Sequence, residues 1–253
     1  MLEQFLEANI WALIVIMARV GTFFSLMPGF SAGYIPTRYR LAIALSVTFL
    51  LLPVLDAYVP PLPASAAAMF LVLAGEVIIG AFLASIGMFM ISALQAAGTF
   101  IAYFSSMANA LIQDPVSSQQ SSVISGFLST AALVAIFASD LHHVVIRAMV
   151  DSFSLFQPGQ PIAIGDMSQT LAVTLSEAFT LGLKLASPML LAALVYYLSL
   201  GILGRLMPTL QVFFFGLPFQ ISMQIWVLMI CFSSMMMVFL QAYSGAYTPF
   251  LAP

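Results

Sequence analysis

Three side chains near the middle of the chain are of the types that bind metal ions: Asp140, His142 and His143. Carboxylate and imidazole groups are usual ligands of zinc and related metals. Adjacent histidines on a helix, however, point about 100° apart, and no third ligand follows at helical spacing. We therefore expect this cluster to mark a turn at the membrane interface. We expect no metal and no cofactor in the chain.

Three further ionisable residues, Glu76, Glu177 and Lys184, lie within long apolar runs. An ionisable group inside a membrane helix costs roughly 2.5–3.5 kcal/mol on insertion scales, so it usually faces protein or water. Glu177 and Lys184 lie two turns apart along one helix face, which is too far for a direct ion pair. Both a structural contact to a neighbouring helix and a role in ion or proton movement stay open.

Common catalytic and nucleotide-binding motifs are absent from the sequence. It contains no HExxH, GxSxG, P-loop or GxGxxG pattern. Within the apolar runs, no two carboxylates share a helix face at a spacing of three or four residues. An intramembrane enzyme built around Asp140, His142 and His143 stays an alternative, but we expect a protein that is not an enzyme.

The composition indicates an integral membrane protein. Of 253 residues, 62% are apolar and only 6% are charged, whereas soluble domains carry about 25% charged residues. The first residues, MLEQFLEANI, contain Glu3 and Glu7 and no basic residue, so we expect no cleavable signal peptide. Six dispersed basic residues and a net charge of −3 exclude a basic stripe for nucleic acid.

Long apolar runs predict an all-α membrane protein with about six long, kinked helical segments. The runs cover approximately residues 8–27, 41–55, 66–104, 123–153, 171–202 and 219–243. At 1.5 Å per residue the longest run would form a rod of about 58 Å, against a hydrocarbon core of about 30 Å. Such helices must kink, re-enter the membrane or stand against other protein. Gly87 and Pro188 are plausible break points.

The segment Leu198 to Gln224, LSLGILGRLMPTLQVFFFGLPFQISMQ, carries a distinctive pattern. A small-residue helix end is followed by LGxLxRxxPxxxVFxxGxP, which contains Arg205, Pro208, Gly216 and Pro218. This pattern resembles the FliR/MopE/SpaR family of flagellar biosynthetic and type III secretion proteins. Further matching stretches are RVGTFFSLMPGF, IPTRYRLAIAL, the Asp-Pro pair of the central loop and LHHVVIRAMVDSF. The resemblance covers about residues 10 to 245.

The resemblance implies a single export-gate domain with a FliP-like part at about 1–165 and a FliQ-like helical hairpin at about 166–253. It also implies the partners FliP and FliQ in a hetero-oligomeric gate, FlhB at the cytoplasmic entrance and FlhA nearby. Unfolded rod, hook and filament subunits would be the cargo. The place would be the bacterial inner membrane, in the flagellar basal body. A virulence-injectisome subunit, a small-solute transporter and an ion channel stay open.

In this family the loop after the third helical stretch closes the pore as a plug, and the match places it at about residues 105–122. Irregular backbone at membrane depth is tolerated only in a water-filled or protein-enclosed cavity. Family plugs carry Phe near the Asp-Pro pair, and here other apolar residues take its place. The residues expected to form or flank the seal are Met107, Leu111, Ile112, Asp114 and Pro115. An ordinary exposed connection is the alternative.

The Arg-containing motif is expected to serve assembly rather than gating. Arg205 lies at the mouth of the expected hairpin, where its guanidinium can cap exposed helix-end carbonyls at the cytoplasmic surface. Pro208 and Pro218 are expected to fix the turn.

Overall fold

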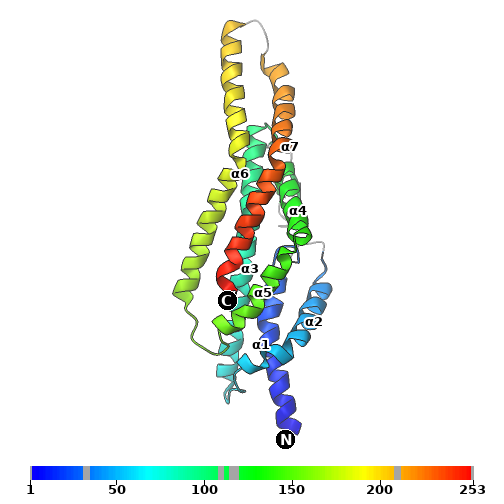
Figure 1. Ribbon diagram of the computed structural model, residues 1–253, viewed down its shortest axis with the longest axis vertical. Coiled ribbons are helices and arrows are strands. Elements are labelled where there is room, and N and C mark those ends of the chain that lie inside the picture. The colour runs from blue at the N-terminus through cyan, green and yellow to red at the C-terminus, as the bar shows by residue number, and fades with distance from the viewer. Residues whose placement is uncertain (1, 31–34, 108–110, 114–119, 208–211, 252–253) are drawn as a thin grey trace. The chain divides into compact units, whose positions relative to one another are not determined.

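The computed structural model describes residues 2–30, 35–107, 111–113, 120–207 and 212–251, and most of them lie in α-helices (Figure 1). The helices are α1 (Leu2–Leu26), α2 (Thr37–Leu55), α3 (Ala66–Phe104), α4 (Val123–Ala138), α5 (Leu141–Leu155), α6 (Ile164–Leu206) and α7 (Val212–Tyr247). Two 3₁₀ turns, η1 (Asp56–Tyr58) and η2 (Thr248–Phe250), follow α2 and α7. The predicted all-α membrane fold is confirmed.

Five of the described helices, α1, α2, α3, α6 and α7, are long and apolar enough to cross a membrane. The pair α4 and α5 passes the same test together but is bent by 75°. The run at 123–153, expected as one segment, is therefore two helices. The bend lies at Asp140, whose φ of 57° and ψ of 14° are left-handed. Asp tolerates this conformation better than most residues because its short side chain can hydrogen-bond locally.

Neither of the two expected break points interrupts its helix. Helix α3 continues through Gly87 and α6 continues through Pro188. Gly87 serves packing instead, because a Cβ there would lie 2.6 Å from Oη of Tyr247. Pro188 cannot donate to the carbonyl of Lys184, but Oγ of Ser187 donates to that carbonyl at 2.7 Å. A neighbouring hydroxyl thus replaces the lost backbone bond inside an apolar helix.

The chain forms two compact units that interleave along the sequence. The first contains Met1–Phe89, Phe137–Leu175 and Tyr243–Pro253, and the second contains Met90–Ile136 and Ser176–Ala242. These units do not follow the division at about residue 165 that the family resemblance implies, and they do not test it. That division stays a prediction.

Close helix contacts in each unit occur where a glycine removes the side chain. In the first unit, a Cβ on Gly80 of α3 would lie 2.5 Å from the carbonyl oxygen of Arg19 on α1. In the second unit, a Cβ on Gly182 of α6 would lie 2.7 Å from the carbonyl oxygen of Ala93 on α3. Such contacts bring backbones together where lipid gives no hydrophobic drive for association.

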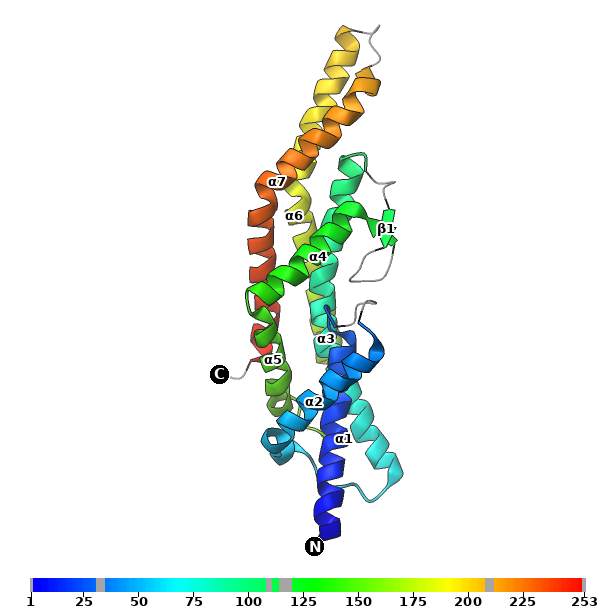
Figure 2. The same ribbon diagram turned by 90° about the vertical axis from the view of Figure 1, so that its right-hand side faces the viewer.

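The central polar stretch contains a small β-hairpin, which the sequence analysis did not predict (Figure 2). Strand β1 (Leu111–Gln113) pairs antiparallel with β2 (Gln120–Ser122), with Leu111 opposite Ser122. Ser122 then caps α4, because its Oγ accepts a hydrogen bond from the amide of Ser125 at 3.1 Å. The same hydroxyl donates to the carbonyl of Gly98 at 3.3 Å, which anchors the hairpin's end to α3.

Candidate functional site

A buried ion pair lies in the first unit. Nε of Arg19 donates to Oε2 of Glu76 at 2.7 Å, and the two side chains are 0% and 1% exposed. Nη1 of Arg19 donates to Oγ of Ser152 at 3.0 Å, and Nη2 donates to the carbonyl of Phe156 at 2.7 Å. The guanidinium carbon lies 3.9 Å from the ring centroid of Phe153. Of the two readings left open for Glu76, the geometry supplies the structural contact, and it joins α1, α3 and α5.

The other two ionisable residues expected inside the membrane are exposed. Glu177 and Lys184 both lie on α6 in the second unit. No ion pair within the described part of the chain involves either of them. Their neighbours would have to be lipid headgroups, water or another protein. Neither of the roles left open for them is decided.

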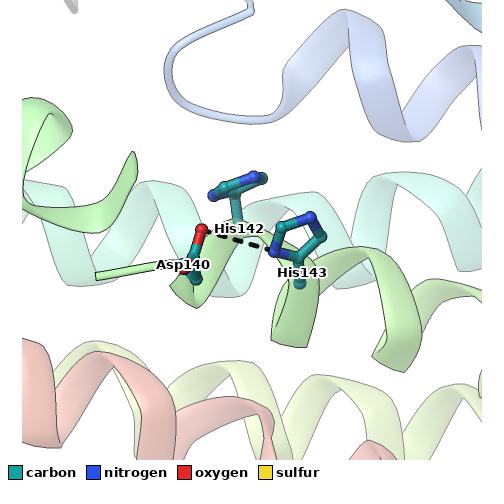
Figure 3. A group of neighbouring side chains, drawn as sticks. All are labelled: Asp140, His142 and His143. Carbon is teal, nitrogen blue, oxygen red and sulfur yellow. Dashed lines mark ion pairs between the residues drawn. The ribbon is translucent and has the colours of Figure 1, made fainter. Parts of the chain in front are cut away.

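The Asp140, His142 and His143 cluster sits at the bend between α4 and α5, where a turn was expected (Figure 3). Nδ1 of His143 lies 3.6 Å from Oδ1 of Asp140. The two imidazole centroids are 4.0 Å apart, so the expectation that the rings diverge is wrong. Rotation about the side-chain bonds offsets the angle between their Cα–Cβ directions. Potential ligand atoms of the three residues lie within 4.8 Å of one another.

This cluster nevertheless lacks features of a strong cation site. Asp140 and His143 are exposed, and all three residues lie at the amino end of α5. That end carries the positive pole of the helix dipole and disfavours a cation. The absence of a metal stays a prediction.

The expected gate segment begins at a well-defined helix end. The amide of Met107 donates to the carbonyl of Ala102 at 2.9 Å, and the amide of Ser106 donates to the carbonyl of Tyr103 at 3.3 Å. Ser106 has a left-handed φ of 58°. These bonds and this conformation form a Schellman motif, a common helix stop. Met107, one of the expected sealing residues, is half-buried.

The remaining expected gate residues are only partly described. Leu111 and Ile112 lie in β1. Asp114 and Pro115 lie outside the described residues. Their expected contribution to a seal stays a prediction.

Residues 176–206 of α6 and 212–242 of α7 form an antiparallel hairpin in the second unit (Figure 1). Oη of Tyr196 donates to the carbonyl of Gly216 at 2.6 Å, and Nε2 of Gln224 donates to the carbonyl of Met189 at 3.1 Å. Gly216 of the sequence motif therefore has a packing role, because a Cβ there would lie 2.8 Å from that same Oη.

Two of the other motif residues, Arg205 and Pro218, lie in the described part of this hairpin. Arg205 is exposed in the last turn of α6. Pro208 lies outside the described residues. Pro218 does not fix the turn as expected, because α7 begins at Val212 and contains it.

One further residue joins this hairpin to the start of the gate segment. The side chain of Gln220, 2% exposed, donates through Nε2 to the carbonyl of Phe104 at 2.6 Å and to Oη of Tyr197 at 2.8 Å. Its Oε1 accepts from Oγ of Ser106 at 3.2 Å. The carbonyl of Phe104 lies in the last turn of α3, where helix carbonyls lack intrahelical partners.

Comparison with known proteins assigns the family. A model of the family described as "Bacterial export proteins, family 1" matches residues 10–246. The chain belongs to this family.

The similar curated proteins extend the family resemblance over most of the chain. The flagellar biosynthetic protein FliR of Caulobacter vibrioides is 30% identical over 93% of this chain and 94% of its own length. FliR of Bacillus subtilis is 27% identical over 92% of this chain and 90% of its own length. FliR of Escherichia coli is 29% identical over 88% of this chain and 83% of its own length. The resemblance drawn from the sequence motif is confirmed.

Two site residues of this bacterial export protein were missed by sequence reasoning. Arg19 and Gln220 are polar residues inside apolar runs, as Glu76 is, and that was the available signal. Sequence spacing could not show that Arg19 meets Glu76 on another helix. It also could not show that Gln220 faces a helix end rather than lipid.

Proposed function

We propose that this chain is a structural pore subunit of the flagellar type III protein export gate. It passes unfolded rod, hook and filament subunits, and it acts by enclosing a path rather than by catalysis. Its place is the bacterial inner membrane, in the flagellar basal body. The FliR relatives support the flagellar system over a virulence injectisome, since each carries the flagellar name.

The observation that carries the proposal is the exposed apolar length of the helices. Helix α6 has 43 residues, whereas about 20 suffice to span a bilayer. Only 28% of the membrane-spanning stretch of α6 is buried within the protein. The corresponding buried shares are 22% for α7 and 17% for α2. Lipid alone cannot cover a helix of twice the bilayer thickness. Other protein subunits therefore cover the parts of α6 and α7 that extend beyond the bilayer, which fits a hetero-oligomer with FliP and FliQ.

The segment at 105–122 is the pore closure in this proposal. Two fixed points bound it: the helix stop at Ser106 and the cap that Ser122 provides for α4. Between them the chain is long enough to reach into an enclosed path and has polar residues that need no lipid contact. Met107, Leu111 and Ile112 supply the apolar seal, with Asp114 and Pro115 in the loop. FlhB at the entrance and FlhA nearby complete the path.

Co-purification tests the assembly. A tagged chain expressed with FliP and FliQ should bring both down as one stable complex, and expressed alone it should aggregate or be degraded. Deleting its gene should stop motility and secretion of hook protein, with recovery on complementation. A monodisperse chain that purifies without partners, and a motile deletion strain, would contradict the proposal.

A further inference from the structure

We propose that Gln220 is a latch that holds the start of the gate segment against the α6–α7 hairpin. This inference rests on the proposed function of residues 105–122 as the pore closure. Gln220 is a positioning residue, because it acts through the backbone of the segment and not on the cargo.

The contacts of Gln220 use both ends of its amide. The donor end bonds the carbonyl of Phe104 and the hydroxyl of Tyr197, and the acceptor end takes the hydroxyl of Ser106. Phe104 is the last residue of α3, and Ser106 is the first left-handed residue after it. One side chain of α7 therefore holds the two residues at which α3 ends and the gate segment begins.

The backbone at Ser106 explains why an external hold is needed. A left-handed residue at a helix stop is usually glycine, because a Cβ raises the energy of this conformation. Ser106 has a Cβ and a φ of 58°. The hydrogen bond from its hydroxyl to Gln220 offsets part of that energy. Withdrawing Gln220 would leave the Phe104 carbonyl unpaired and remove this support.

The latch gives the hairpin control over the segment. Any movement of α7 relative to the end of α3 separates the amide of Gln220 from both residues at once. The position of Phe104 and Ser106 is thus coupled to the packing of the hairpin. A shift of the hairpin would release these two residues, because hydrogen bonds of this kind are lost within a displacement of about 1 Å.

Gln224 provides a matched control on the same helix. It lies one turn beyond Gln220, it is also a buried glutamine at 1% exposure, and its Nε2 bonds the carbonyl of Met189 on α6. It therefore holds the hairpin together, because the hydrogen bond that its Nε2 donates joins α7 to α6 and not to α3. Gln220→Leu and Gln224→Leu remove the same amide from the same kind of site.

The first readout is amide hydrogen exchange of the full-length chain, purified in its membrane complex. The amides of Ser105 and Met107 are protected by bonds to the carbonyls of Ile101 and Ala102, each of 2.9 Å. Gln220→Leu should speed exchange of these amides by about tenfold or more, and Gln224→Leu by less than about twofold. Unchanged exchange in Gln220→Leu would overturn the latch.

Two conservative variants keep the test decisive if Gln220→Leu does not accumulate. Ser106→Ala and Tyr197→Phe each delete one hydroxyl that contacts Gln220 and leave the rest of the side chain in place. Each should speed exchange at Ser105 and Met107 by about threefold or more. If both variants exchange like the wild type, the latch is wrong.

The second readout separates the latch from the proposed pore closure. Gln220→Leu in an assembled complex should lower the membrane potential of cells, and Gln224→Leu should not. Faster exchange together with a normal membrane potential would keep the latch and contradict the closure. A fallen potential with unchanged exchange would contradict the latch and keep the closure.

Discussion

At the scale of single residues, the buried charge of Arg19 has a hydrogen-bond partner for each of its three guanidinium nitrogens. Arg19 makes three hydrogen bonds and one ring contact. These contacts replace the water that its guanidinium loses on burial. Glu76 supplies the balancing charge. A buried pair of this kind is costly to break, since the remaining charge has no solvent to return to.

Glu76→Ala should lower the free energy of unfolding by about 3–5 kcal/mol, because it leaves the Arg19 charge buried and unpaired. The measurement is the thermal stability of the purified complex. The control is Arg147→Ala, since Arg147 pairs with Asp151 at 3.6 Å but is 69% exposed. That variant should change stability by less than about 1 kcal/mol.

Arg19→Met combined with Glu76→Leu should lower the stability of the complex less than Glu76→Ala alone, because it leaves no buried charge unpaired. The opposite order would refute the account of the pair.

At the scale of helices and strands, apolar runs were enough to predict the helices but not their interruptions. Runs at 66–104 and 171–202 correspond to α3 and α6 because length and hydropathy alone favour helix in lipid. The bend at Asp140 depends on one left-handed residue, and Pro188 is accommodated by one hydroxyl. Such local bonds are invisible in a hydropathy pattern. The β-hairpin was missed because its strands are only three residues long and one of them, Gln120–Ser122, consists of polar residues alone.

Gly98→Ala should destabilise the second unit by about 1–3 kcal/mol. An added Cβ would collide with the backbone of Ser125 on α4, which cannot rotate away. The matched control is Gly201→Ala on α6, where nothing lies within 4 Å of the added Cβ. That change should be neutral or slightly stabilising, because alanine favours helix over glycine. The melting temperatures of the complexes that carry each variant measure this difference. Equal melting temperatures would contradict the close contact between Gly98 of α3 and Ser125 of α4.

Arg205→Glu should reduce the yield of the complex with FliP and FliQ. Arg205 is exposed in the last turn of α6, where a positive charge favours the helix carbonyl end and a negative charge opposes it. Arg205→Lys should retain most of the yield, since it keeps the charge. Quantitative blotting of co-purified partners measures the effect. If Arg205→Glu assembles fully while export stops, the residue serves gating and the assigned assembly role is wrong.

At the scale of the whole molecule, the chain exposes large apolar side chains along helices that are longer than a bilayer. Large apolar side chains such as Phe49, Leu191, Phe219 and Ile230 are more than half exposed, and a membrane covers only about 20 residues of each helix. The sequence motif around Arg205 was sufficient to predict the family, whereas the partners follow only from the resemblance. The position of the seal could not be derived from periodicity, because a loop's contacts depend on the neighbours that enclose it.

The most direct test of the central claim is the ion permeability of cells that carry a deletion of residues 110–120. This deletion takes out the strand β1 and most of the loop. Losing about 100 Å² of apolar sealing contact would cost about 2.5 kcal/mol, near a 70-fold shift between closed and open pores. The complex should still assemble with FliP and FliQ, and the membrane potential should fall.

Changing Ser117, Ser118, Gln119 and Gln120 to Ala provides the control, because these polar residues are expected to solvate the loop rather than seal it. The control strain should keep its membrane potential. An assembled deletion complex that holds the membrane potential of the wild type would show that another element closes the path, and would make residues 105–122 an ordinary connection.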